Sequence, residues 1–221
     1  MYLAQSLSAR ERDLVPPAII SSIRKEAEPL DHSIIVEKFG IRLRPVRLSD
    51  AGFIVNIHNS AHALGYVGDS AQTEASQRDW LNEYFVRPGD YYFIIELAEN
   101  RQMLGTIGIY NIRDGAGEVG RLIILPGVVP SAPASYWLIT HVFFAILGLD
   151  AEIFTVVESN SAITFFKHIG AHLTGASKPH IIAGKPVNLL EYRVTRSEWP
   201  LISANLTRCA LIAKKLRSTL H

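Results

Sequence analysis

The order of elements between Met103 and Gly170 constrains the fold of this chain more than any other feature. Met103–Ile112 is rich in β-branched and apolar residues, as a strand is. Residues 113–117 (Arg-Asp-Gly-Ala-Gly) are typical of a turn, and Glu118–Leu125 is a second apolar run. Two such runs around a short turn predict a β-hairpin.

A helix, a strand and a second helix follow this hairpin. After a Pro-rich loop, the apolar run 134–148 predicts a helix, 153–157 a short buried strand, and 161–169 a helix that Gly170 ends. A strand, a crossover helix and a neighbouring strand make a βαβ unit, whose two strands run parallel. The sequence therefore predicts an α/β fold with a parallel strand pair.

Elements on both sides of this unit complete the domain. Ile41–Arg47 alternates apolar and basic residues, which is typical of a strand at an exposed sheet edge. The stretch from Gly170 to Pro186 contains prolines and glycines, which favour a loop. The other expected elements are helices over 50–59 and 73–85 and strands over 91–97 and 188–195.

Length and composition predict one domain with two appendages. A chain of 221 residues that is 48% hydrophobic buries one full core. We expect an N-terminal extension over 1–40, a domain over 41–200 and an amphipathic C-terminal helix over 201–221. The apolar stripe of that helix should pack against the domain or against a second subunit, which makes a homodimer one expectation.

Charge and cysteine content narrow the partners. The net charge is +1, with 22 basic against 21 acidic side chains, so we expect neither a nucleic-acid nor an anionic-membrane surface. Cys209 is the single cysteine, which excludes an intramolecular disulfide and, with no secretory signal visible at the start, favours the reducing cytoplasm. The most apolar run, 134–149, is shorter than the roughly 20 residues of a membrane span and favours a buried helix.

Four segments carry a resemblance to a known family: Ile41–Asp50, Gly105–Tyr110, Glu118–Pro126 and Ala162–Gly170. In this order and spacing they resemble the acetyl-CoA-dependent GNAT superfamily of N-acetyltransferases, especially its ribosomal-protein and amino-sugar branches. The resemblance covers about residues 41 to 199. It implies a central mixed, twisted sheet of about six or seven strands flanked by helices.

The resemblance also implies an activity. Acetyl-CoA would be the acyl donor, and the acceptor a small amine such as an amino-sugar nucleotide, or a protein N-terminus, attacking directly in a ternary complex. The alternative is a catalytically degenerate GNAT domain that binds a ligand or a protein without acyl transfer.

The family's pyrophosphate-binding signature falls on residues 129–134. Ala134 fits the signature, whereas Val129 replaces a basic or amide residue and Ala132 replaces a glycine, and two prolines remove backbone donors. In this reading Ser131, Ala132 and Ala134 contact the cofactor at the start of a helix. The alternative is an ordinary strand-to-helix connection with Ser131 as the N-cap.

The resemblance assigns the cofactor arm to backbone groups of Ile123, Ile124 and Leu125. Asn160 is a further candidate for contact with the arm, and an N-cap role for it is equally open. Phe166 is also expected to contact the cofactor. It occupies the position where the family usually has a tyrosine that acts as general acid, and a phenyl ring has no proton to donate.

Glu118 is the candidate general base, because protein-acetylating family members carry such a glutamate on this strand. We expect Ile107 and Ile109 nearby to raise its pKa. The alternative is a solvated glutamate at a hairpin end. Tyr110 is the second catalytic candidate, although aromatic residues of this kind also serve as core.

The acceptor site is predicted from His58, Asn59 and Tyr84. His58 and Asn59 occupy the place where amino-sugar acetyltransferases often have a Trp-Arg-Asn run, of which only the asparagine is present. The histidines of the chain show no spacing typical of zinc ligands, so no metal site is expected.

Overall fold

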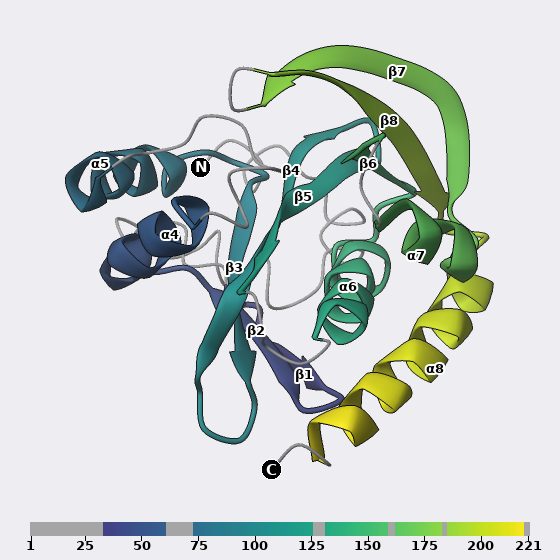
Figure 1. Ribbon diagram of the computed structural model, residues 1–221, viewed down its shortest axis with the longest axis horizontal. Helices are drawn as coiled ribbons and strands as arrows, with labels where there is room; N and C mark the ends of the chain where they lie inside the picture. The colour runs from purple at the N-terminus through teal and green to yellow at the C-terminus, as the bar shows by residue number, and fades with distance from the viewer. Residues whose placement is uncertain (1–32, 61–72, 126–130, 159–161, 183–184, 219–221) are drawn as a thin grey trace, which may run out of the picture.

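The computed structural model describes residues 33–60, 73–125, 131–158, 162–182 and 185–218 (Figure 1). The strands are β1 Val36–Lys38, β2 Ile41–Pro45, β3 Tyr91–Leu97, β4 Met103–Arg113, β5 Ala116–Ile124, β6 Ala151–Val157, β7 His172–Ile182 and β8 Lys185–Thr195. The helices are α4 Ala51–His58, α5 Glu74–Tyr84, α6 Ala132–His141, α7 Ala162–Ile169 and α8 Trp199–Ser218, with a 3-10 turn η1 Leu48–Asp50 and a π-helical turn η3 Val142–Ile146.

The described strands form one sheet of eight strands in the order β1-β2-β3-β4-β5-β6-β8-β7. β5 and β6 run parallel, and every other neighbouring pair in this order is antiparallel. The predicted α/β class, the mixed sheet, the β4–β5 hairpin and the parallel pair are therefore confirmed. The sheet has more strands than the six or seven that we expected.

β1 and β7 account for the extra strands. Val36 of β1 lies opposite Leu43 of β2, so the sheet begins before the predicted domain start at residue 41. β7 occupies a stretch that we expected to be a loop because of Pro179. The expectation fails because β7 is the edge strand of the sheet, where a missing N–H is tolerated.

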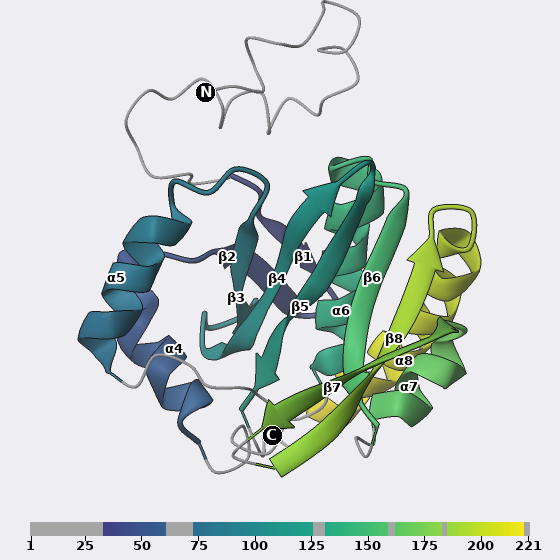
Figure 2. The ribbon, with the colours of Figure 1, turned by 90° about the horizontal axis from the view of Figure 1, so that it is seen from above.

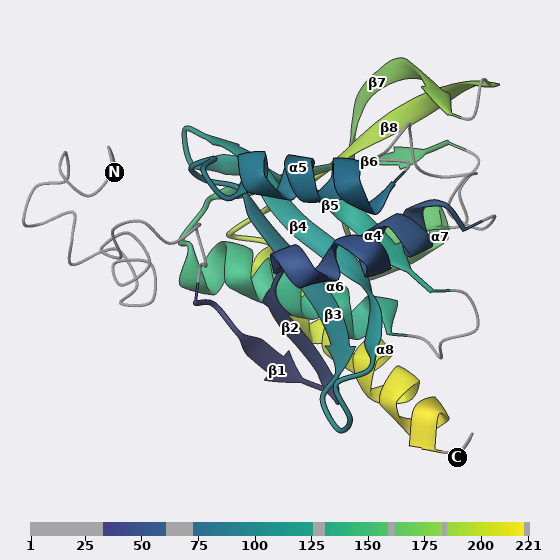
Figure 3. The same cartoon turned by 90° about the vertical axis from the view of Figure 1, so that its left-hand side faces the viewer.

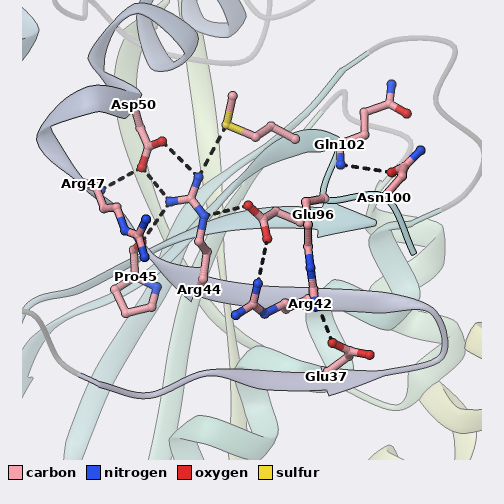
Figure 4. Close-up of polar contacts among 11 residues, drawn as sticks. Glu37, Arg42, Arg44, Pro45, Arg47, Asp50, Glu96, Asn100 and Gln102 are labelled. Carbon is pink, nitrogen blue, oxygen red and sulfur yellow. Dashed lines mark hydrogen bonds and ion pairs between the residues drawn. The ribbon is translucent and has the colours of Figure 1, made fainter. Parts of the chain in front are cut away.

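β2 is not the exposed edge strand that its alternating pattern predicts, since it lies between β1 and β3. Its arginines instead form ion pairs in a buried network (Figure 4). The Arg44 guanidinium donates to Glu96 Oε1 at 2.6 Å and to Asp50 Oδ2 at 2.7 Å, and both carboxylates are buried. Asp50 also accepts from the Arg47 N–H at 2.7 Å. The network joins β2 and β3 to the start of α4.

Helices cover both faces of the sheet. α4 and α5 pack on one face, against β3 and β4, and α6, α7 and α8 pack on the other (Figures 2 and 3). The predicted helix over 134–148 corresponds to α6 continued by η3, and its Ile139 and Phe143 are fully buried. Of the described helices, none has both the length and the apolar character of a membrane span.

α8 shows the amphipathic character that was predicted for it. Ile202, Leu206 and Ala210 are buried in the core against α6. Leu201 and Ile212 are exposed on its outer side. The apolar stripe therefore packs only in part on the domain. The homodimer stays a prediction.

Candidate active site

The site is built around the point where β5 and β6 part. The two strands pair over three positions only, the last of which joins Glu118 to Ile153. Beyond it, β5 continues to Ile124 along β4, and β6 continues to Val157 along β8 (Figure 2). This divergence opens a V-shaped gap in the middle of the sheet. Among the described strands, none pairs with the second half of β5 on that side.

The second half of β5 presents backbone groups to this gap. Leu125 N–H donates to the Leu104 carbonyl at 2.8 Å, so its hydrogen-bonding groups face β4. Since these groups alternate along a strand, those of Leu122 and Ile124 face the gap. This corrects the expectation that all of Ile123, Ile124 and Leu125 are available to a cofactor. The Ile123 side chain packs against Ile57 of α4.

Glu118 lies at the vertex of the gap. Tyr110 is its partner across the β4–β5 pair, and the Asn111 side-chain amide donates to Glu118 Oε1 at 3.2 Å. Ile107 and Ile109 belong to the buried core, and Ile109 lies opposite Val119. The Glu118 carboxylate is therefore bound by the Asn111 amide, and Ile107 and Ile109, which we expected beside it, lie in the core instead.

Tyr110 lies beside Glu118 and is partly buried. Burial and the nearby Glu118 charge raise the pKa of its phenol, so it is protonated at neutral pH. Its hydroxyl lies over Gly120, where a Cβ atom would overlap it. The Arg121 guanidinium lies 4.4 Å from the centre of its ring.

The start of α6 is the segment where the family resemblance places the pyrophosphate of the cofactor. Ser131 is buried, and its Oγ has no hydrogen-bond partner among the described residues. The Ser131 carbonyl accepts from the N–H of Ser135 at 2.9 Å. Ala132 begins the helix, and Ala134 is fully buried. Val129 lies outside the described residues.

Phe166 packs in an aromatic cluster. Its ring centre lies 4.4 Å from that of Phe154, 5.4 Å from that of Tyr136 and 5.9 Å from that of Tyr192. Phe166 therefore takes part in the core, and contact with a cofactor stays a prediction. Asn160 lies outside the described residues.

Sequence reasoning missed a buried acid in this cluster. Glu152 is fully buried on β6, one position before the last β5–β6 pair, and the Tyr136 hydroxyl donates to its Oε1 at 2.6 Å. Burial raises the pKa of Glu152 to about 8. Its Oε2 and the Tyr192 hydroxyl have no partner among the described residues. The available signal was a lone acid within an apolar strand.

Two of the predicted acceptor residues lie at the end of α4, and the third, Tyr84, lies in the core. His58 ends α4, burial lowers the pKa of its imidazole, and its Nδ1 is buried without a partner among the described residues. Asn59 caps the same helix, donating its N–H to the Val55 carbonyl at 2.9 Å. Tyr84 is 1% exposed and its hydroxyl accepts the Tyr92 N–H at 2.9 Å. Tyr84 is therefore a core residue, which corrects its predicted acceptor role.

A hollow of about 560 Å³ lies where β6 ends. It is bounded by the β7–β8 hairpin and lined by Val157, Glu158, Pro179, Pro186, Val187 and Asn188. Its one acidic group, Glu158, accepts from the Asn188 side-chain amide at 3.2 Å. Among the described residues no cluster of His, Cys, Asp or Glu has the geometry of a metal site.

Comparison with known proteins identifies the family. The family model of the GNAT acetyltransferase domain matches residues 41–172. The chain belongs to this family. No curated protein sequence matches it significantly.

Solved structures share the fold at low identity. One is apo FdhC, a nucleotide-linked sugar GNAT, with 22% identity, 81% of this chain and 98% of that chain covered, and a TM-score of 0.67. A spermidine N-acetyltransferase SpeG mutant from Vibrio cholerae has 17% identity, coverage of 73% and 97%, and a TM-score of 0.65. The ribosomal-protein-S5-alanine acetyltransferase from Vibrio fischeri has 18% identity, coverage of 75% and 98%, and a TM-score of 0.65.

Proposed function

We propose that this protein is an acetyl-CoA-dependent N-acyltransferase that acts on a small amine. The observation that carries the proposal is the gap between β5 and β6 with Glu118 at its vertex, within a chain of the GNAT acetyltransferase family. An amino-sugar nucleotide is the favoured acceptor, and a protein N-terminus is the alternative. The similar structures named for nucleotide-linked sugar, spermidine and ribosomal-protein substrates support this range of amines.

Residues of this chain fit acetyl-CoA at both ends of the gap. The backbone groups of Leu122 and Ile124 would align its amide-bearing arm, since they face the gap. The Ser131 Oγ, which has no partner among the described residues, and the N-terminus of α6 would take its phosphates, because helix N-termini favour anions. When bound, the thioester supplies an activated acetyl group.

Two side chains at the vertex would move protons. Glu118 accepts a proton from the attacking amine as the new N–C bond forms. The sulfur that leaves as the C–S bond breaks needs a proton in return, and the Tyr110 phenol can donate one because its raised pKa keeps it protonated. Phe166 cannot fill this role.

The hollow at the end of β6 suits the acceptor. Its volume of about 560 Å³ lies in the range of small-ligand pockets. Glu158 would attract a protonated amine, and the prolines and valines would contact the rest of the molecule. His58 and Asn59, at the end of α4, remain candidates for the opposite side of the acceptor.

The setting is also a proposal. We place the protein in the cytoplasm, since Cys209 is its single cysteine. Residues 1–40 are proposed as an N-terminal extension to the domain. Within this range β1 and the residues next to it belong to the sheet of the domain.

The alternative is a degenerate GNAT domain that binds a ligand without catalysis, which Phe166 favours. Calorimetric titration with acetyl-CoA, followed by an assay of CoA release with sugar amines, polyamines and peptide N-termini, separates the two functions. Binding with release of CoA on adding one amine supports the transferase. Absence of acetyl-CoA binding by the folded protein, or binding without acyl transfer to any of these amines, would favour the alternative.

A further inference from the structure

Arg121 holds an unusual backbone conformation in the middle of β5. Its φ is 54°, in the left-handed region, which a non-glycine residue adopts only at a cost of about 1 kcal/mol or more. Such a conformation persists only where the surroundings hold it. The contacts of Arg121 show how it is held.

The strained residue is part of a β-bulge. Gly120 lies opposite Gly108, and the next pair joins Ile123 to Thr106, so Arg121 and Leu122 together face Ile107. A bulge of this kind inserts one residue and reverses the faces that follow. Val119, before the bulge, packs in the core beneath α6, whereas Ile123, after it, packs on Ile57 of α4.

The bulge also decides which backbone groups reach the gap. With the extra residue, the hydrogen-bonding groups of Leu122 and Ile124 face away from β4. A slip of one residue would turn them toward β4 and turn the Ile123 side chain away from α4. The cofactor edge of β5 therefore depends on the bulge.

The side chain of Arg121 is fixed by an ion pair and by three aromatic side chains that surround its guanidinium. Its guanidinium binds both carboxylate oxygens of Asp90, with Nη2 to Oδ2 at 2.9 Å. The same group lies 4.4 Å from the ring centre of Tyr110 and 5.2 Å from those of Trp80 and Tyr92. Only 20% of the Arg121 side chain and 9% of Asp90 is exposed, so the pair is shielded from solvent. Bidentate pairing of this kind needs the planar fork of arginine.

The backbone of Arg121 is fixed separately. The hydroxyl of Thr106, a fully buried residue on β4, donates to the Arg121 carbonyl at 2.9 Å. Asp90 and the aromatic rings thus hold the side chain, and Thr106 holds the carbonyl.

We propose that Arg121 is a positioning residue that clamps the β5 bulge and so sets the backbone edge that receives the arm of acetyl-CoA. This inference rests on the proposed function for its ligand, and on the structure alone for the clamp. Arg121 also orients Tyr110 through the contact with its ring. It does not itself touch the reacting atoms.

The test combines amide exchange with cofactor affinity in Arg121→Met, Arg121→Lys and Asp90→Asn. Arg78→Met is the matched control, because Arg78 makes an exposed ion pair with Glu74 on α5. We expect faster exchange at the N–H groups of Ile123 and Leu125, which face β4, in Arg121→Met and an acetyl-CoA Kd at least about tenfold weaker. Arg121→Lys should recover part of both losses, and KM for the amine should change little.

The proposal is overturned if folded Arg121→Met keeps wild-type exchange at the N–H groups of Ile123 and Leu125. It is also overturned if Kd and amine KM worsen together in proportion to a fall in Tm, since that marks a general loss of packing. Failure of the wild-type protein to bind acetyl-CoA would refute the proposed function instead. The exchange measurement tests the clamp without any cofactor, so the two failures are distinguishable.

Discussion

The buried acid Glu152 should make the stability of the protein depend on pH in a direction opposite to that of most carboxylates. Burial raises its pKa from 4.5 to about 8 in the folded state. Between these values the unfolded chain releases a proton that the folded chain keeps, so the free energy of unfolding falls as pH rises. The contribution of the protonated Glu152 to the free energy of unfolding is complete below pH 4.5 and is lost by about pH 8.

The magnitude follows from the size of the shift. A difference of about 3.5 pKa units corresponds to about 5 kcal/mol at 1.36 kcal/mol per unit. Because both titrations are gradual, the interval from pH 5 to pH 8 contains roughly 3 kcal/mol of it. For a chain of this size that is a shift in Tm of roughly 6 to 12 °C.

Glu152→Gln isolates this effect, because it keeps an oxygen that can accept from the Tyr136 hydroxyl and removes the titration. The free energy of unfolding is measured in urea at pH 5, 6, 7 and 8 for the wild type and the variant. We expect the free energy of unfolding of the variant, relative to that of the wild type, to rise by roughly 3 kcal/mol from pH 5 to pH 8. Glu99→Gln, at an exposed carboxyl in the β3–β4 turn, serves as the control.

Parallel curves for the wild type and Glu152→Gln would refute this reasoning. A companion variant gives a second check. The Tyr136 hydroxyl bond lowers the pKa of Glu152, so Tyr136→Phe should raise it further and extend the loss of stability to higher pH.

Three further predictions concern the site and the core. Glu118→Gln should lower turnover about 10²-fold or more with little change in acetyl-CoA affinity, and an unchanged rate would remove Glu118 from the mechanism. Acetyl-CoA should bind no tighter than about tens of micromolar, and Val129→Arg with Ala132→Gly and Pro133→Lys should tighten calorimetric binding about tenfold. Submicromolar binding by the wild type would contradict this. Leu206→Ala in the buried face of α8 should cost about 2 to 5 kcal/mol in urea unfolding, whereas a loss below 1 kcal/mol would show that α8 is not part of the core.

Local patterns predicted the middle of the fold well. The β4–β5 hairpin, α6 and β6 each have a periodicity or turn chemistry that lies within a few neighbouring residues. β7 was missed because Pro179 and its neighbours resemble a loop until the edge position of the strand is known. β2 was misplaced because Arg42 and Arg44 indicate solvent, whereas Glu96 from β3 neutralises them inside the protein.

The site was predicted only in part, because several of its contacts join residues that lie far apart in the sequence. Glu118 was proposed because the family resemblance fixes its position relative to the strand end, and its role stays a prediction. The Arg121 contact with Asp90 spans 31 residues and the Tyr136 contact with Glu152 spans 16. Neither pair has a local pattern. Side chains that meet only through the tertiary fold leave no periodic signal in the sequence.

The opening between β5 and β6 is bordered by polar pairs on both faces of the sheet. Glu152, one position before the strands part, is held by Tyr136 under α6. Arg121, at the bulge beyond that point, is held by Asp90 on the α5 side. Apolar side chains alone would favour closure of the gap, because closing it buries more surface. Hydrogen bonds with fixed directions resist that closure, so these two pairs should contribute more to the shape of the opening than to the total stability of the protein.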